Sequence, residues 1–252
     1  HEIDDTLQVD SKFATEYRYR GGNVNNYVTF NNETWRIIGI IPTEDTNGNV
    51  GNRFKIIRNE SIGNKYWNEN GTNDWTIATL NTYLNNDYYN TLSTNVKNMI
   101  GTAKYYLGGY DWTDDTFTSD IMWQYERKKA NDVSGTYYYG TNPIMQNDVS
   151  KKIALMYVSD YGYAASKECS KGLVYYIDDS NCITTNNWLD KSQHEWLLPQ
   201  LSADDFYAFF ADGVGNVNGD GVNSTEYAVR PVLYLSSNVI ESSKAFCFAR
   251  CI

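Results

Sequence analysis

One polar segment has the residue types of a calcium loop. It runs Asn216-Val-Asn-Gly-Asp-Gly221 and continues to Glu226, so that oxygen-bearing side chains fall at alternate positions with glycines between them. Ca²⁺ binds through several oxygen ligands, and its loops need a glycine at the sharp turn. Here the first ligand is a neutral asparagine and the glutamate comes one residue early. The pattern favours an ordinary turn and leaves calcium at Asn216, Asn218 and Asp220 as the alternative.

The four cysteines form two close pairs, Cys169 with Cys182 and Cys247 with Cys251. Neither pair has the histidine or cysteine companions of a zinc site, and the second has one residue too many between its thiols for a thioredoxin-like motif. We therefore predict two disulfides, the first closing a hairpin-like loop with a turn at 178–181. Closing that loop stabilises by about 3 kcal/mol. Disulfides in turn predict an oxidising, extracellular location.

Side chains for catalysis are scarce. The chain has only two histidines, His1 and His194, which leaves almost no material for a Ser-His-Asp triad or a histidine-based metal site. Adjacent carboxylates such as Asp204 and Asp205 would not face each other as an acid/base pair unless the fold turned them together. We expect His194 on the surface, and a protein that is not an enzyme and has no cofactor beyond the calcium alternative.

The composition excludes some partners. The chain has 252 residues, with 21 Lys and Arg against 31 Asp and Glu, for a formal net charge of -10. Nucleic acids and anionic membrane surfaces both favour basic patches, so we expect neither nucleic acid nor direct membrane contact. No apolar run approaches the length that spans a bilayer. The 22 tyrosines, set among asparagine, serine and glycine, are typical of ligand-binding surfaces.

Hydrophobic spacing predicts an α+β protein. Runs of β-branched and aromatic residues bounded by turn residues predict strands, and apolar residues three or four apart after a capping side chain predict helices. The predicted elements are an antiparallel meander (26–30, 34–41 and 53–58), helices from 73 or 74 to 84, at 92–100 and from 118 or 119 to 125, and strands at 152–158 and 229–235. We expect Ser159 to cap a turn after the strand that ends at residue 158.

Two apolar anchors, WLLP and VRPVLYL, bound the polar segment. Trp196 belongs to the first anchor and is assigned to the scaffold. Arg230 lies in the second, where a buried guanidinium is tolerable only beside a carboxylate or carbonyl, and we expect it to tie the last strand to the core. Between the anchors, Ser202-Ala-Asp-Asp205 followed by phenylalanines is typical of a capping box that opens a short helix.

Several short sequence motifs, which follow one another in a fixed order along the chain, resemble those of a known family. They are NYVTFNNETWRIIGI, DWTIATLNTYLN, ALMYVSDYGYA, NNWL, WLLP and YAVRPVLYL, spread over residues 20–236. Together they resemble a family of secreted or pilus-linked surface proteins of Gram-positive gut-type bacteria. The closing VRPVLYL resembles a strand of the formylglycine-generating-enzyme branch of C-type lectin-like folds. In some members of that broader fold, diversity-generating retroelements vary the C-terminal polar surface.

The resemblance implies a C-type lectin-like α+β fold with antiparallel sheets, two or three helices and long loops. Residues 1–20 are polar and charged, and we expect from their composition a lead-in segment, with a helix as one alternative, ahead of a single domain at 21–252. The resemblance would make residues 206–211 extended, which we favour over the short helix. The cysteine pairs do not reproduce the catalytic copper site of true formylglycine-generating enzymes, in keeping with a protein that is not an enzyme.

We therefore expect an extracellular, cell-surface binding module of the adhesin type. Its partner would be a surface protein or glycan of a host, a bacterium or a phage, with a pilus assembly as a further partner. The binding face is expected near residues 200–226, at Phe206, Tyr207, Phe210, Asp212, Asn216, Asn218, Asp220, Asn223 and Glu226. The alternative is a structural pilin-like subunit whose polar loops only solvate a shaft.

Overall fold

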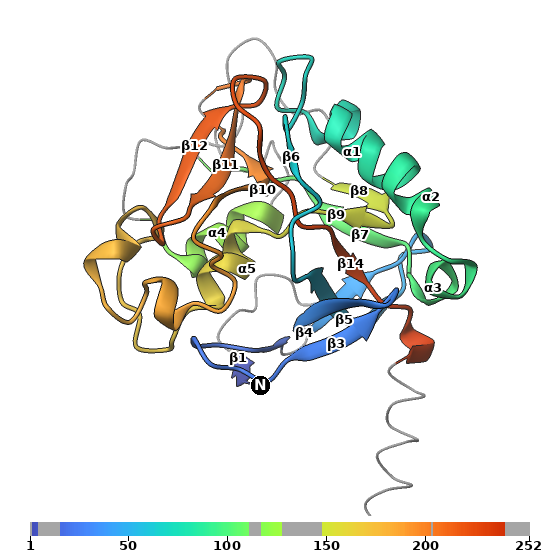
Figure 1. Cartoon of the computed structure of the whole chain (residues 1–252), viewed down its shortest axis with the longest axis horizontal. Coiled ribbons are helices and arrows are strands. Elements are labelled where there is room, and N and C mark those ends of the chain that lie inside the picture. Colours follow the sequence, from blue (N-terminus) through green and yellow to red (C-terminus); the bar gives the residue numbers. More distant parts are fainter. Residues whose placement is uncertain (1, 5–15, 111–116, 128–147, 203, 240–252) are drawn as a thin grey trace, which may run out of the picture.

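The computed structural model describes residues 2–4, 16–110, 117–127, 148–202 and 204–239 of the chain. Within them, short helices pack around three sheets that are antiparallel apart from one strand pair (Figure 1). The predicted α+β class is confirmed. The predicted pair Cys247–Cys251 lies outside the described residues.

The N-terminal meander builds a seven-stranded sheet in the order β1-β2-β4-β5-β14-β9, with β3 also paired to β4. Its strands are β1 (Glu2–Asp4), β2 (Glu16–Arg18), β3 (Tyr27–Phe30), β4 (Glu33–Glu44), β5 (Val50–Arg58), β9 (Ile153–Ala154) and β14 (Val232–Tyr234). The predicted meander is confirmed. The last strand, predicted at 229–235, is buried and is limited to Val232–Tyr234. The segment 1–20, expected as a lead-in, contributes β1 and β2 to this sheet.

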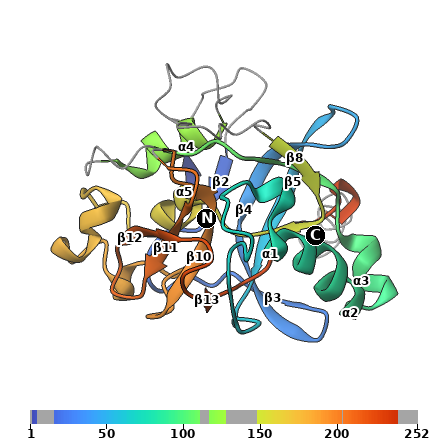
Figure 2. The same ribbon diagram turned by 90° about the horizontal axis from the view of Figure 1, so that it is seen from above.

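A second sheet of five strands has the order β12-β11-β10-β13-β6. Its strands are β6 (Asn64–Lys65), β10 (His194–Gln200), β11 (Tyr207–Asp212), β12 (Val217–Gly221) and β13 (Tyr227–Ala228). A small third sheet pairs β7 (Ala103–Tyr106) with β8 (Asp148–Lys151). Seen from above, β10–β13 gather on the side away from β8 and the first helices (Figure 2).

The helices are short, and those within residues 75–99 and 119–127 follow the predicted positions. The first helical region contains the 3₁₀ turn η1 (Trp75–Ile77), α1 (Thr79–Tyr83), a π-helical segment η2 (Leu84–Tyr88), α2 (Tyr89–Thr91) and α3 (Thr94–Met99). Later come α4 (Ser119–Arg127), α5 (Val158–Tyr163) and the 3₁₀ segments η4 (Leu173–Asp178) and η5 (Thr184–Asn186). Of these, α5, η4 and η5 were not predicted. Asp74 accepts a hydrogen bond from the Thr76 N–H and so caps η1, one turn before the helix that it was expected to start.

The pairing of β2 with β4 requires a glycine. The register of β4 against β5 skips Ile38, which forms a bulge, and Gly39 then faces β2. A Cβ atom at Gly39 would lie 2.1 Å from the backbone oxygen of Tyr17. Any other residue would therefore push β2 away from the sheet.

The strand predicted at 152–158 is wrong in length. Only Ile153–Ala154 is strand, and α5 begins at Val158. The cap also differs from the prediction, because the Tyr157 N–H donates to Asp160 Oδ2 at 2.9 Å. Ser159 lies inside the helix, where its N–H donates to Glu126 Oε1. A buried carboxylate thus ends the strand and starts the helix.

The polar segment is more regular than its composition predicts. Residues 207–212 are extended, as the resemblance implied, and the short helix suggested by the capping box is wrong. β11 pairs with β10 on one side and with β12 on the other, so its backbone groups are satisfied as a central strand. β12 extends through a stretch expected to be loop. Turns remain at 213–216, where Gly213 and Gly215 have positive φ, and at 222–224 after β12.

The five-stranded sheet separates two apolar cores. Leu197 and Phe209 belong to the core on one face, and Trp196 and Phe210 to the core on the other. This alternation is what a strand with both faces covered requires. Because both cores contact it, the sheet is a rigid support for whatever its exposed edge presents.

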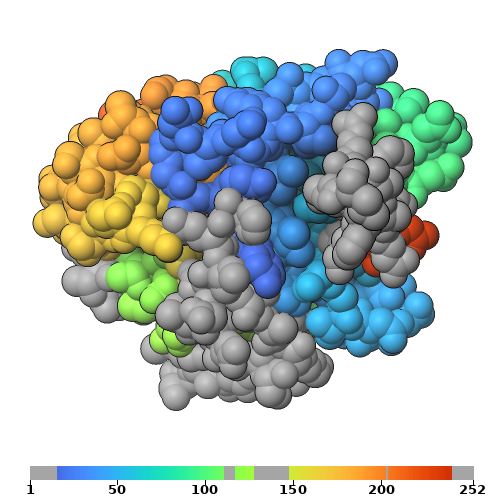
Figure 3. All heavy atoms as spheres, turned by 90° about the horizontal axis from the view of Figure 1, so that it is seen from below, coloured from blue at the N-terminus to red at the C-terminus, as the bar shows by residue number. Residues whose placement is uncertain are grey.

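A cluster of six buried charges joins the N-terminal strands to the helices. The charge cluster consists of Glu16, Arg18, Lys55, Glu126, Arg127 and Asp160. Arg18 donates to Asp160 Oδ1 and to Glu16 Oε2, each at 2.8 Å. Lys55 donates to the other oxygen of Asp160. Seen from below, the residues coloured blue, which include β2, β3 and β4, cover much of the visible surface (Figure 3).

Burial and pairing displace the pKa values of the charge cluster in opposite directions. Burial would raise the pKa of Asp160, but Lys55 and Arg18 hold it at about 2. Burial raises the pKa of Glu126 to about 7, against the opposing effect of Arg127 and Ser159. Asp160 is therefore ionised at neutral pH, whereas Glu126 titrates near it.

Replacing the guanidinium of Arg18 should be costly. Arg18→Met leaves Glu16 buried without its main counter-charge and Asp160 without one of its two, so we expect the free energy of unfolding to fall by about 3–5 kcal/mol. Urea unfolding measures this change in the free energy of unfolding. Lys171→Met, which removes an exposed cation, is the matched control and should change stability by no more than about 0.5 kcal/mol. Equal stabilities of the two variants would contradict this role for Arg18.

Glu126 should make stability depend on pH. Its pKa is raised on folding, so its stabilising contribution is complete below about pH 4.5 and is lost as the pH rises through 7. Relative to Glu126→Gln, which stays neutral, the wild type should lose at most about 3 kcal/mol of unfolding free energy between these pH values. Thermal unfolding at several pH values gives the comparison. A difference between the two proteins that does not change with pH would show that Glu126 does not titrate in this range.

Candidate ligand-binding surface

Two buried side chains anchor the candidate surface. Arg230 donates from Nε to both carboxylate oxygens of Glu195, at 2.7 and 2.9 Å, and from Nη2 to the Leu189 carbonyl at 2.6 Å. Trp196 Nε1 donates to the Lys65 carbonyl at 2.9 Å. Arg230 thus has the carboxylate and carbonyl partners that its burial requires. Arg230 thereby links β10 to the segment that precedes β14, and Trp196 links β10 to β6.

One face of the five-stranded sheet carries aromatic and polar side chains. Residues directly opposite one another on paired strands point to the same face, and the pairs here are His194 with Asp212, Trp196 with Phe210, and Phe210 with Asn218. The Tyr227 ring lies 4.6 Å from Phe210 and 5.2 Å from His194. His194 is exposed, as predicted. Trp196 and Phe210 are buried in the core beneath this face. We name its partly or fully exposed residues, His194, Asp212, Asn218, Asp220 and Tyr227, the outer face.

Asp212 organises the turn at one end of the outer face. Its Oδ1 accepts from the N–H groups of Val214 and Asn216, and its Oδ2 accepts from the side-chain amides of Asn216 and Asn218. Asn216 Oδ1 in turn accepts from the Ile177 N–H of η4. The polar groups of Asn216 are therefore used to hold the turn and η4 together.

Asp220 and Tyr227 join the outer face to β13. The Tyr227 hydroxyl donates to Asp220 Oδ2 at 2.7 Å. Burial, together with Asp220, raises the pKa of Tyr227 to about 12. The tyrosine therefore stays protonated and keeps donating to Asp220 throughout the neutral range.

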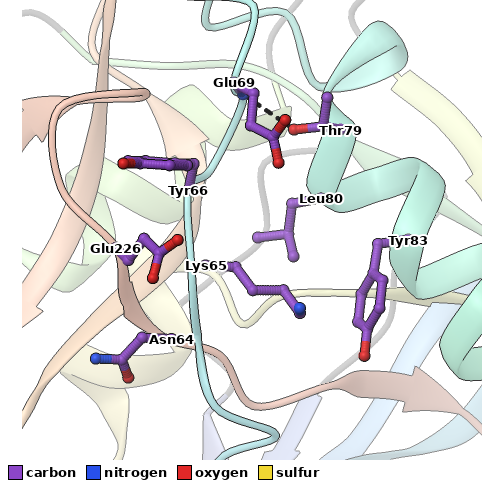
Figure 4. A pocket seen from close by; sticks show the side chains of 8 residues that line it. All are labelled: Asn64, Lys65, Tyr66, Glu69, Thr79, Leu80, Tyr83 and Glu226. Carbon is purple, nitrogen blue, oxygen red and sulfur yellow. Dashed lines mark hydrogen bonds between the residues drawn. The ribbon is translucent and has the colours of Figure 1, made fainter.

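A hollow of about 130 Å³ opens beside Tyr227, between β6 and α1 (Figure 4). Lys65 pairs with Tyr227 across the strands and stretches over the Tyr83 ring, with Nζ 3.9 Å from the ring centre. Tyr66, Glu69 and Glu226 line other parts of its wall, with Leu80 at the base and Asn64 at one end. Neither glutamate forms an ion pair within the described residues.

The predicted site residues fall into three places rather than one. Asp212, Asn218 and Asp220 share the outer face, and Asn216 holds its turn. Phe210 is buried in the core beneath this face, which leaves it unable to contact a ligand directly. Phe206 and Asn223 lie together around Gly71, and Glu226 lines the hollow. Tyr207 points away from the outer face because it alternates with Ala208.

Sequence reasoning missed most of the hollow. Lys65, Tyr66, Glu69 and Tyr83 are about 140 to 160 residues from Glu226 along the chain, by subtraction of their residue numbers. No local pattern links residues so far apart. Residues 194–200 and 207–212 both contain continuous apolar runs, and such runs do not reveal which side chains share a face until the strands and their pairing are known.

No group of three His, Cys, Asp or Glu in the described residues could hold a metal ion. The side-chain amides of Asn216 and Asn218 both donate to Asp212, and Asp220 accepts from Tyr227. Calcium at these three residues stays a prediction.

The disulfide Cys169–Cys182 is present, and its loop is not hairpin-like. The loop contains η4, a 3₁₀ segment, and a turn in which Asp179 accepts from the Asn181 N–H. Ile177, in η4, is held to the outer-face turn through Asn216. The disulfide therefore secures the segment that supports one end of the outer face.

A family model described as a domain of unknown function, DUF6273, matches residues 51–237. The chain belongs to the DUF6273 family. The matched segment contains the outer face, the hollow and the disulfide, whereas β2 and its Arg18 precede it. Searches of curated proteins and of solved structures found no match. Among the described residues, no helix has both the length and the apolar character needed to cross a membrane.

Removing the disulfide should lower stability measurably. Replacing Cys169 and Cys182 by serine opens a loop between residues 13 positions apart, and we expect a loss of about 3 kcal/mol in unfolding free energy. Denaturant unfolding of the oxidised wild type and of the double variant measures the loss, and the reduced wild type should resemble the variant. Identical midpoints for all three samples would rule out a stabilising role.

Proposed function

We propose that this DUF6273 domain is an extracellular, non-enzymatic binding module that recognises a surface glycan or protein through the hollow and the adjoining outer face. The observation that carries the proposal is the gathering of unpaired polar groups and tyrosine rings at the edge of a rigid sheet. Glu69 and Glu226 lack ion pairs within the described residues, and Lys65 rests on a ring.

The hollow has the chemistry of a sugar site. Tyrosine rings such as Tyr66 can stack on the apolar face of a sugar, while carboxylates accept hydrogen bonds from its hydroxyl groups. At about 130 Å³ it is smaller than the sites of whole drug-sized ligands, so it suits one ring or side chain of a longer ligand. The rest of that ligand would lie over Tyr227, which pairs with Lys65 of the hollow, and over His194, whose ring is 5.2 Å from that of Tyr227.

We also propose that the α+β architecture is C-type lectin-like. Two features support this in addition to the resemblance of the sequence phrases. The strand β14 returns to pair with β5 of the N-terminal meander, and the polar segment lies on a separate sheet. The disulfide supports an extracellular, cell-surface location, since such bonds persist in oxidising compartments.

A glycan array, followed by titration of any sugar retained, tests the proposal. Glu226→Ala and Tyr66→Ala should each weaken binding about tenfold or more, as expected for residues at the centre of an interface. Asp87→Ala removes an exposed carboxylate of η2 outside the hollow and should bind like the wild type.

Binding to intact cells or to a purified surface protein, lost in the same two variants, would identify a protein ligand at the same site. Binding that survives both substitutions would contradict the proposed site. If no glycan, cell or protein is bound, the result would favour the alternative of a structural pilin-like subunit.

A further inference from the structure

Lys55 of β5 and Asp160 of α5 meet in the interior of the molecule. Nζ of Lys55 contacts Oδ2 of Asp160, and the two side chains are only 1% and 0% exposed. Aromatic rings surround the amine, with Nζ 4.1 Å from the centre of the Tyr157 ring and 5.3 Å from that of Tyr234. A primary amine and a carboxyl group are thus in contact where almost no solvent reaches.

Asp160 is fixed at both oxygens. Oδ1 accepts from Arg18 Nη1 at 2.8 Å, and Oδ2 accepts from the Tyr157 N–H at 2.9 Å as well as from Lys55. The carboxyl group therefore keeps one orientation toward the amine. Reacting groups held in this way behave as if their concentration were very high, with effective molarities on the order of 10⁵ M or more in well-oriented cases.

From this geometry we propose that Lys55 and Asp160 condense to an intramolecular amide that joins β5 covalently to α5. The bond Nζ–Cγ forms as the amine attacks the carboxyl carbon. Two of the three ammonium protons pass to Oδ2, the Cγ–Oδ2 bond breaks, and this oxygen leaves as water. The third proton remains on the amide nitrogen, so atoms and charge balance without any oxidant or reductant.

Arg18 is placed to assist the reaction. When the amine adds to Cγ, negative charge develops on Oδ1, the oxygen to which the Arg18 guanidinium donates. A donor already aimed at the developing charge stabilises such an intermediate. Arg18 therefore acts on the reacting carboxyl group, in addition to its role in the charge cluster.

The protonation states are compatible with this step. Burial lowers the pKa of Lys55 to about 8, although Asp160 opposes the shift, and the neutral amine is the nucleophile. Burial would raise the pKa of Asp160, but Lys55 and Arg18 hold it low, so its proton comes from Lys55 within the pair. The reaction removes one positive and one negative charge. Glu16 keeps Arg18 and Arg127 as its partners.

Mass spectrometry of the intact full-length chain tests the proposal. After reduction and alkylation of the cysteines, we expect the mass to fall short of the sequence mass by one water molecule. Lys55→Met cannot form the amide and should have its full sequence mass, which can be measured whether or not that variant is stable.

A tryptic digest of the denatured chain distinguishes the amide from other losses of water. Cyclisation at Asp212-Gly213 or Asp220-Gly221 would also remove water, but it would persist in Lys55→Met. The amide should block cleavage after Lys55 and give a branched peptide that contains both Lys55 and Asp160. A wild-type chain of full mass, or cleavage after Lys55 with Asp160 recovered in a linear peptide, would overturn the proposal.

Discussion

Asp160 accepts hydrogen bonds from Arg18, from Lys55 and from the backbone of Tyr157, and these groups belong to β2, to β5 and to the turn that starts α5. Charges this deeply buried are tolerated only when every partner is in place. The N-terminal strands, α4 and α5 must therefore close together. The fold depends on this constraint more than on any single apolar contact, because removing one partner leaves another charge buried and unpaired.

The helix α5 connects the charge cluster to the candidate surface. The hydroxyl of Tyr161, next to Asp160, has two acceptors for its single proton, Asp190 Oδ2 at 2.6 Å and the Gly215 carbonyl at 3.0 Å. Gly215 lies in the turn that Asp212 organises. One short helix thus connects the buried charges with the end of the outer face. The surface proposed for binding is consequently supported from below by fixed polar contacts rather than carried on a free loop.

Local patterns in the sequence predicted the parts of the fold that local physics determines. The meander, the buried last strand and the disulfide Cys169–Cys182 follow from side-chain alternation and from cysteine spacing. β12 was missed because asparagine and glycine favour turns, and its pairing with β11 overrides that preference. The hollow and the charge cluster were missed for another reason. Lys65 with Glu226, and Arg18 with Asp160, are brought together only by the topology of the sheets.

If ligand binds at the hollow, on a scaffold that stays rigid, nuclear magnetic resonance of the backbone amides during titration with a bound sugar will locate it. We expect chemical-shift changes confined to residues 64–69, 79–83 and 226–227, together with parts of the outer face, and constant shifts around Lys55 and Asp160. Shifts concentrated elsewhere, such as at η4, or spread through the core, would contradict binding at the hollow.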